Sequence, residues 1–145
     1  MRDRLLFLDF DGVLHPNFCD PEDFFCLIPT ILDSITAAPP DLKVVISSSW
    51  RFHHEYEGLK NFFPEQLQAR LIGATGPAIA GRHARYREIN AFLDKLPRRV
   101  EWRALDDAKF EFPDHCPELI LCDGRNGILK REHEILVEWL RSNRP

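Results

Sequence analysis

The sequence predicts an α/β fold built on a central parallel sheet. Short apolar runs recur along the chain, and each of them ends in a polar or acidic residue. Parallel strands that are buried on both faces have this composition. Strands are predicted at residues 5–10, 43–49, 102–107 and 118–123, with a fifth at residues 70–75. Helical stretches lie between these runs, and this alternation of strand and helix is typical of α/β proteins.

Helices are predicted over residues 24–38, 54–63, 85–96 and 130–141. The first, third and fourth place apolar residues at the spacing that makes one face of a helix. Prolines mark several boundaries, since Pro29 falls in the first turn of the first helix and Pro39-Pro40 ends it. Pro64 and Pro97 end the second and third helices. In a sheet of this kind, sites form at the carboxyl ends of the strands.

Length and composition favour one domain that spans residues 1–145. A chain of 145 residues with 44% hydrophobic residues suits one globular core. The net charge of -4 is too small to indicate a nucleic-acid or membrane partner. No apolar run approaches the roughly 20 residues of a membrane span. Asp9 interrupts the N-terminal apolar run before it is long enough for a signal peptide, so a cytoplasmic location is predicted.

The cysteines agree with that location. Cys19, Cys26, Cys116 and Cys122 form no CxxC pair and no zinc-type spacing. Cys122 lies in an apolar run, where a buried free thiol is expected. Reduced cysteines are typical of proteins in the cytosol.

Two carboxylates follow the first predicted strand, in the sequence Asp9-Phe10-Asp11-Gly12. Burial of unpaired charges is costly, and a divalent cation with a phosphoryl substrate would remove that cost. One carboxylate can attack phosphorus, while a second protonates the leaving oxygen and then activates water. Gly12 allows a sharp turn and a close approach to a ligand. A solvated acidic turn or a helix cap is the structural alternative.

This strand and turn resemble the first motif of the haloacid dehalogenase (HAD) superfamily, an apolar strand followed by DxDxT/V, which here runs from Asp9 to Val13. The resemblance implies a Rossmann-like, three-layer fold. It also implies that Asp9 is the nucleophile and Asp11 the general acid/base, with Asp9 and the backbone carbonyl of Asp11 binding Mg²⁺. Dehalogenases of the superfamily lack the second aspartate, so Asp11 favours phosphoryl transfer.

The second predicted strand ends in Ser47-Ser48-Ser49-Trp50-Arg51. Hydroxyl and backbone N–H groups at a strand end can hold a phosphate oxygen. The second HAD motif is similar, and the resemblance favours Ser48 as the phosphate-contacting hydroxyl and Ser49 as a backbone donor, with Ser47 as the alternative register. Helix-capping serines are the structural alternative. Trp50 is expected to pack, and Arg51 either reaches the substrate or lies on the surface.

The third HAD motif is a Lys or Arg near a helix start, which holds nucleophile and phosphate together electrostatically. Related small HAD proteins carry a basic residue four positions before an isoleucine of the helix, and here that residue is Arg85. Arg82 and Arg87 stay open as alternatives because the usual lysine is missing. A solvated basic helix face is the structural explanation of all three.

The fourth HAD motif matches the paired acids Asp106 and Asp107 at the end of the strand at residues 102–107. The resemblance implies that they complete the Mg²⁺ site, and leaves open which of them binds the metal directly. Lys109 is a candidate to neutralise one of them. Further along the chain, Asp123 is either an outer-shell acid or, more simply, part of an Asp-Gly turn.

Two loops bear on the substrate. The segment between Leu14 and Phe24 holds about ten residues, which is room for a flap and not for a cap domain. The loop at residues 96–100 is also short. The chain therefore resembles small HAD proteins with minimal or no cap, which often act on macromolecules, and above all the HAD domain of Swiss-army-knife RNA-repair proteins.

The predicted function is a Mg²⁺-dependent phosphatase whose substrate is a phosphorylated molecule, with a nucleic acid end or a protein as candidates. No membrane partner is expected, and the sequence leaves the oligomeric state open. One alternative is a phospho-acceptor signalling domain, although its phosphorylated aspartate would follow a middle strand that here ends in serines. The other is a non-catalytic phosphate-binding domain.

Overall fold

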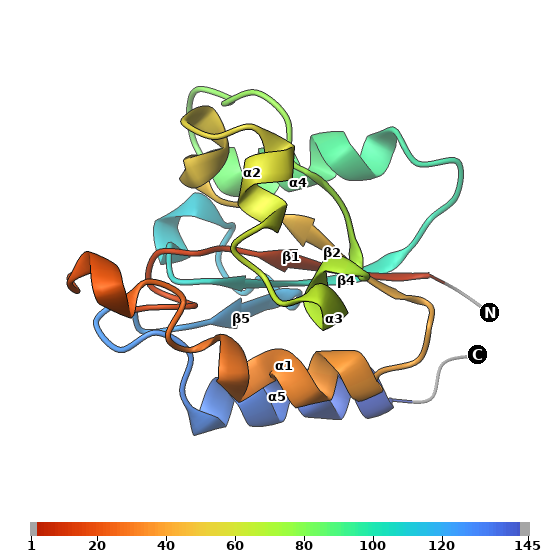
Figure 1. Cartoon of the computed structure of the whole chain (residues 1–145). Helices are drawn as coiled ribbons and strands as arrows, with labels where there is room; N and C mark the ends of the chain where they lie inside the picture. Colours follow the sequence, from red (N-terminus) through yellow and green to blue (C-terminus); the bar gives the residue numbers. More distant parts are fainter. Residues whose placement is uncertain (1–2, 143–145) are drawn as a thin grey trace.

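The computed structural model describes residues 3–142 and contains one five-stranded parallel sheet (Figure 1). The strand order is β3-β2-β1-β4-β5. The strands are β1 (Arg4–Leu8), β2 (Leu42–Ile46), β3 (Leu71–Ala74), β4 (Glu101–Asp106) and β5 (Leu119–Leu121). All four pairings are parallel. The prediction of an α/β fold with a central parallel sheet is confirmed.

The helices are α1 (Ile28–Ala37), α2 (Tyr56–Lys60), α3 (Glu65–Gln68), α4 (Ala84–Asp94) and α5 (Lys130–Arg141). Short 3-10 helices cover Pro21–Asp23, Ser49–Phe52 and Lys109–Glu111. The fourth predicted helix has the predicted bounds, and the third differs from its prediction by one residue at its start and two at its end.

Two helix predictions need correction. The helix predicted from residue 24 begins at Ile28, because Phe25 has a φ of 64° and so interrupts the helical backbone. The helix predicted over residues 54–63 is only α2, and the short helix α3 was not predicted. Pro64, which was expected only to end a helix, is the N-cap of α3, an end where proline costs no helical hydrogen bond.

The two faces of β1 pack against different helices. Leu6 and Leu8 belong to the larger core, together with apolar residues of α1 and α5. Leu5 and Phe7 face the other way, into a smaller core that contains Ile89 of α4. The sheet is thus the middle of three layers, with α1 and α5 on one face and α4 on the other (Figure 1). Burial on both faces explains why β1 shows no apolar-polar alternation.

The carboxyl edge of the sheet is polar. Leu8 pairs with Ile46 and with Leu105, and the hydrogen-bond ladder continues one step further, from the N–H of Asp9 to the Leu105 carbonyl and from the N–H of Ser47 to the Leu8 carbonyl. Residues that follow paired positions of parallel strands lie side by side. The strand ends therefore bring the acidic motifs and the serine motif to one edge.

The connections at this edge are short. Between β1 and α1 the only described helical element is the 3-10 helix Pro21–Asp23, and between β3 and α4 there is none. The loop between α4 and β4, which also has none, lies at the amino edge of the sheet, where Glu101 pairs with Arg4. The Asn17 N–H donates to the Gly124 carbonyl and so ties the first connection to the loop after β5. These connections form a flap and no cap domain. Within residues 3–142, each helix is too short or too polar to cross a lipid bilayer.

Candidate active site

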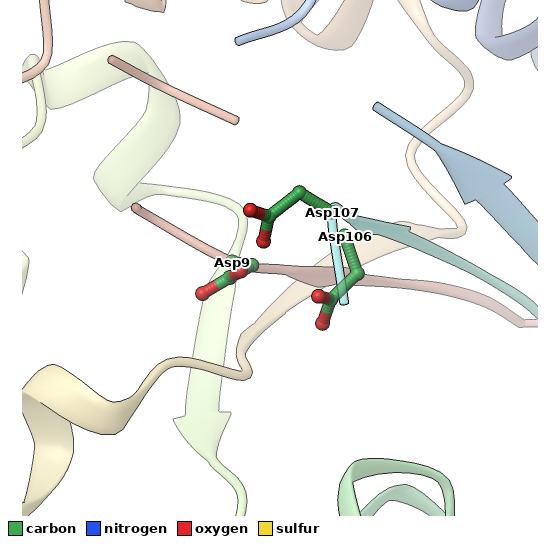
Figure 2. A group of neighbouring side chains, drawn as sticks. All are labelled: Asp9, Asp106 and Asp107. Atoms are coloured by element: carbon green, nitrogen blue, oxygen red, sulfur yellow. The ribbon is translucent and has the colours of Figure 1, made fainter. Parts of the chain in front are cut away.

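The carboxylates that follow β1 and β4 meet at the carboxyl edge of the sheet. Figure 2 shows Asp9 at the end of β1, beside Asp106 and Asp107 at the end of β4. One carboxylate oxygen from each residue lies within 4.8 Å of the other two. Asp9 is 4% exposed and Asp106 is 1% exposed, whereas Asp107 is half-buried. The acids of the first and fourth predicted motifs therefore form one cluster.

Burial and mutual repulsion make ionisation of the two buried acids unfavourable. Burial raises the pKa of Asp9 well above its ordinary value of 3.8, and the negative charge of Asp106 raises it further. Burial also raises the pKa of Asp106, although the positive charge of Arg85 acts in the opposite direction. Two adjacent buried carboxylates resist double ionisation unless positive charge joins them. The cluster consequently favours binding of a cation.

Arg85, in the first turn of α4, is the basic residue at this cluster. Its Nη1 lies 2.7 Å from Oδ2 of Asp106 and 3.5 Å from Oδ1 of Asp9, and it donates to the Ser47 carbonyl at 3.0 Å. Burial lowers the pKa of Arg85, but the charges of Asp106 and Asp9, with the hydrogen bond to Asp106 and the charge of Glu88, together raise this pKa above its ordinary value. Of the alternatives, Arg82 is exposed and Arg87 donates to the carbonyl of Ala80. The structure thus places Arg85, and neither alternative, beside the acids.

The donor set fits a hard divalent cation. Among the described residues, Arg85 forms ion pairs with two of the three carboxylates, those of Asp9 and Asp106, which leaves negative charge uncompensated. Carboxylate oxygens are the ligands that Mg²⁺ prefers, with water completing its coordination shell. Lys109, a candidate to neutralise one acid, is exposed, and only its backbone N–H contacts Asp107. Asp9, Asp106 and Asp107 are therefore the residues that would hold Mg²⁺.

Two glycines make room for the Asp107 carboxylate. A Cβ atom on Gly12, which has a φ of 78°, or on Gly124 would collide with Oδ2 of Asp107. Asn17 lies between them and donates to the same oxygen at 2.8 Å. Sequence reasoning missed Asn17 and Gly124 because no local pattern connects either of them to Asp107. Asn17 and Asp107 are 90 residues apart. Asp123 accepts hydrogen bonds from Arg125 in a turn, as the simpler interpretation predicted.

The carboxylate of Asp11 lies outside the cluster of potential metal ligands found among residues 3–142. Its side chain is 45% exposed. Its Oδ1 lies 2.8 Å from Nε2 of His15, and its Oδ2 accepts a hydrogen bond of 3.0 Å from Nε1 of Trp50. Sequence reasoning gave Trp50 a packing role and did not single out His15. The predicted metal contact of the Asp11 backbone carbonyl stays a prediction.

The three serines differ in their surroundings. The Ser47 hydroxyl is buried and has no hydrogen-bond partner within the described part of the chain. Ser48 is also buried, and its hydroxyl accepts a hydrogen bond from the Trp50 N–H as the N-cap of the 3-10 helix. Ser49 is exposed. The capping interpretation is thus correct for Ser48. Ser47 follows Ile46, the residue that pairs with Leu8, so it lies beside Asp9 and leaves its hydroxyl without a hydrogen bond to the described residues.

The side chain of Arg51 is only 5% exposed, so its surface alternative is wrong. Its Nη2 lies 2.7 Å from Glu88 Oε1, and its other groups donate to the carbonyls of Ser48 and Gly76. Glu88 also accepts a hydrogen bond from the N–H of Ile79. Arg51 and Glu88 therefore connect the ends of β2 and β3 to α4. Glu88 was missed because an acid in a helix usually faces solvent.

The chain matches a family model over residues 5–133, which run from β1 into α5 and include all the motifs described above. That family is the HAD domain in Swiss Army Knife RNA repair proteins. The chain belongs to this family. The HAD resemblance inferred from the motifs is thereby confirmed, and membership places the chain among HAD-type hydrolase domains. Searches of curated proteins and of solved structures gave no match.

Proposed function

We propose that the protein is a Mg²⁺-dependent phosphatase that hydrolyses phosphomonoesters through an aspartyl-phosphate on Asp9. The observation that carries this proposal is the cluster of buried Asp9 and Asp106 with half-buried Asp107, whose ion pairs in residues 3–142 are both with Arg85. Such an excess of negative charge is costly unless a ligand compensates it. Bound Mg²⁺ would reduce the repulsion between the Asp9 carboxylate and the anionic phosphoryl group.

The residues of the chain have distinct roles in this proposal. The Asp9 carboxylate attacks phosphorus, the bond from phosphorus to the leaving oxygen breaks, and Asp11 gives a proton to that oxygen. Water then attacks the phosphoryl group on Asp9, loses a proton to Asp11 and releases inorganic phosphate. Arg85 holds the nucleophile in place and balances charge.

The serine turn completes the phosphoryl site in this proposal. Ser48 or Ser47 supplies a hydroxyl, and Ser49 supplies a backbone N–H. Gly12 lets the backbone approach the phosphoryl group closely. Two observations support Ser47 in this role: its hydroxyl has no hydrogen-bond partner in the described residues, and Ser47 lies beside Asp9 in the parallel pairing of β1 and β2. Arg51 lies near the substrate in this proposal, and its contacts with Ser48 and Glu88 suit it to support the serine turn.

We propose that the substrate is a phosphorylated macromolecule, and first of all a nucleic acid end. Support comes from the absence of a cap domain at the described connections, which leaves the acid cluster open to a large substrate. The family description, which names RNA repair, agrees with a nucleic acid end. Free thiols at all four cysteines and the absence of a membrane-crossing helix among the described residues fit the proposed cytoplasmic location.

The test is Mg²⁺-dependent release of phosphate from 4-nitrophenyl phosphate, from RNA with a 3′- or 5′-phosphate and from a phosphopeptide. The native chain is compared with Asp9→Asn, and with Asp123→Asn as a matched control, because Asp123 is an acid of an exposed turn. We expect Asp9→Asn to lose at least about 10³-fold in turnover. Asp123→Asn is expected to keep the native rate.

The outcomes separate the competing functions. Turnover that survives in Asp9→Asn would contradict the assigned nucleophile. Stable phosphorylation of Asp9 without turnover would identify a phospho-acceptor domain. Absence of turnover on every substrate, combined with absence of Mg²⁺ binding in a titration, would favour the non-catalytic domain.

A further inference from the structure

The Asp11 carboxylate is held at both oxygens by N–H groups from different segments. His15 lies on the flap after β1, and its Nε2 is 2.8 Å from Asp11 Oδ1. Trp50 follows β2, and its Nε1 donates to Asp11 Oδ2 at 3.0 Å. Asp11 itself is 45% exposed, so without these contacts its side chain would be free to change rotamer.

The tautomer of His15 is determined by the backbone. The N–H of Phe25 donates to Nδ1 of His15 at 3.1 Å, so Nδ1 is the acceptor and Nε2 carries the hydrogen that points at Asp11. Phe25 presents this N–H from a left-handed conformation, with a φ of 64°, which is uncommon for a residue other than glycine. Such strain is retained where the surrounding structure requires it.

Packing restrains both donors. His15 is 1% exposed, and its ring centroid lies 4.8 Å from that of Phe24 and 5.9 Å from that of Trp50. Trp50 in turn packs against Phe10 and Phe25, with centroid distances of 5.6 and 5.2 Å. The aromatic cluster therefore limits the positions that the two N–H groups can take, and with them the position of Asp11.

We infer that His15 and Trp50 are positioning residues that orient Asp11 for its proton transfers. This inference rests on the proposed function, in which Asp11 is the general acid/base. Each Asp11 oxygen accepts one of these hydrogen bonds and has a second lone pair for the proton that it gives to the leaving oxygen or takes from water. A group that is held in its working orientation avoids the cost of reorganisation during the reaction.

Substrates with different leaving groups isolate the acid step. Loss of 4-nitrophenolate needs no protonation, whereas the alkoxide of glycerol 2-phosphate does. Since kcat/KM reports the step that forms the aspartyl-phosphate, we expect Trp50→Phe and His15→Leu to lower kcat/KM by about 10-fold for glycerol 2-phosphate and hardly at all for 4-nitrophenyl phosphate. His15→Gln keeps an N–H donor on a side chain of similar reach and is expected to recover most of the loss.

Accumulation of the intermediate isolates the base step. Because Asp11 also activates the attacking water, both loss variants are expected to accumulate phosphorylated Asp9. A burst of 4-nitrophenolate, followed by a steady rate about 10-fold below the native one, would report that accumulation. A purely structural defect would instead lower kcat/KM equally for both substrates and leave the steady-state level of phosphoenzyme unchanged, and that result would overturn the inference.

The tautomer of His15 can be measured without turnover, and this measurement tests the inference even if the variants do not fold. The ¹⁵N chemical shifts of the His15 ring, assigned by their loss in His15→Gln, should show hydrogen on Nε2 in the metal-free native chain. Hydrogen on Nδ1 would overturn the inference even if the loss variants failed to fold. Failure of the proposed function has a different signature, namely a native chain without turnover or an Asp9→Asn chain that keeps it.

Discussion

Arg4, which is buried, and Arg85, which is half-buried, lie at opposite ends of the sheet, and their surroundings differ in charge. Arg4, at the amino end of β1, is 2% exposed and lies 3.6 Å from a carboxylate oxygen of Asp41. It also donates to the carbonyls of Trp139 and Leu140 in the last turn of α5, where the helix dipole favours a cation. At this end, one cation meets one buried acid and the negative end of a helix.

Arg85, at the carboxyl end, meets more negative charge than it can balance. It contacts Asp9 and Asp106, while Asp107 adds a third carboxylate within 4.8 Å. The same type of residue thus contributes to stability at one end and to a ligand site at the other. The difference teaches that the imbalance of buried charge, and not burial of an arginine as such, marks the functional end of this sheet.

The largest expected effect is on stability at the balanced end. Arg4→Met removes the cation beside Asp41 and the donors to two helix carbonyls, so the free energy of unfolding should fall by about 3–5 kcal/mol in urea titrations. Turnover per folded molecule should stay native. Arg125→Met is the control, because Arg125 pairs with Asp123 on the surface, and a loss of stability there as large as that of Arg4→Met would remove the contrast.

The next effect is on catalysis at the unbalanced end. Arg85→Met should lower turnover of 4-nitrophenyl phosphate by about 100-fold, because it removes the donor that lies between Asp9 and Asp106. Arg85→Lys keeps the charge and should recover part of this loss. Arg87→Met is the matched control on the same helix, since Arg87 contacts only a backbone carbonyl near its own turn. Equal losses in the Met variants of Arg85 and Arg87 would contradict the placement.

A smaller effect concerns Mg²⁺ and pH. Because burial raises the pKa of Asp9 and Asp106 above the ordinary 3.8, the native chain binds more protons than the unfolded chain above that pH. Its metal-free stability should therefore fall as pH rises through the native pKa values. Mg²⁺ binds the ionised acids, so at a tenfold excess over its Kd it should add about 1.4 kcal/mol. In calorimetry at fixed Mg²⁺, the gain should be larger at pH 7.5 than at pH 5, and a gain that is the same at both would contradict this account.

The smallest effect is a gain in stability. Asp9→Asn removes one buried charge from the repelling group, so the metal-free variant should be more stable than the native chain by about 1 kcal/mol at pH 7.5. The gain should diminish as pH falls toward 3.8, because native Asp9 then becomes protonated. Urea titrations at both pH values test this, and destabilisation at pH 7.5 would show that the cluster is already balanced without metal.

Local sequence was sufficient for most of the fold. The strands on either side of β1 were predicted because they are short, apolar and followed by polar residues, and prolines placed several helix ends. Two helices, α1 and α3, differ from the prediction because of the backbone conformation at single residues. The left-handed backbone of Phe25 shortened α1, and α3 begins at a proline that was expected only to end a helix.

In the candidate site too, some features follow from local sequence and others from tertiary structure. The sequence by itself determined the α/β architecture and the acids at the ends of β1 and β4, because an apolar strand followed by carboxylates is a local pattern. Only the tertiary structure decided that Arg85 is the basic residue at these acids, that Asn17 contacts Asp107, and that His15 and Trp50 hold Asp11. Most of these contacts join separate segments of the chain, up to 90 residues apart for Asn17 and Asp107, and even the local pair of His15 and Asp11 depends on the folded flap. Strand register and loop conformation bring such residues together, and neither is encoded in a pattern of neighbouring residues.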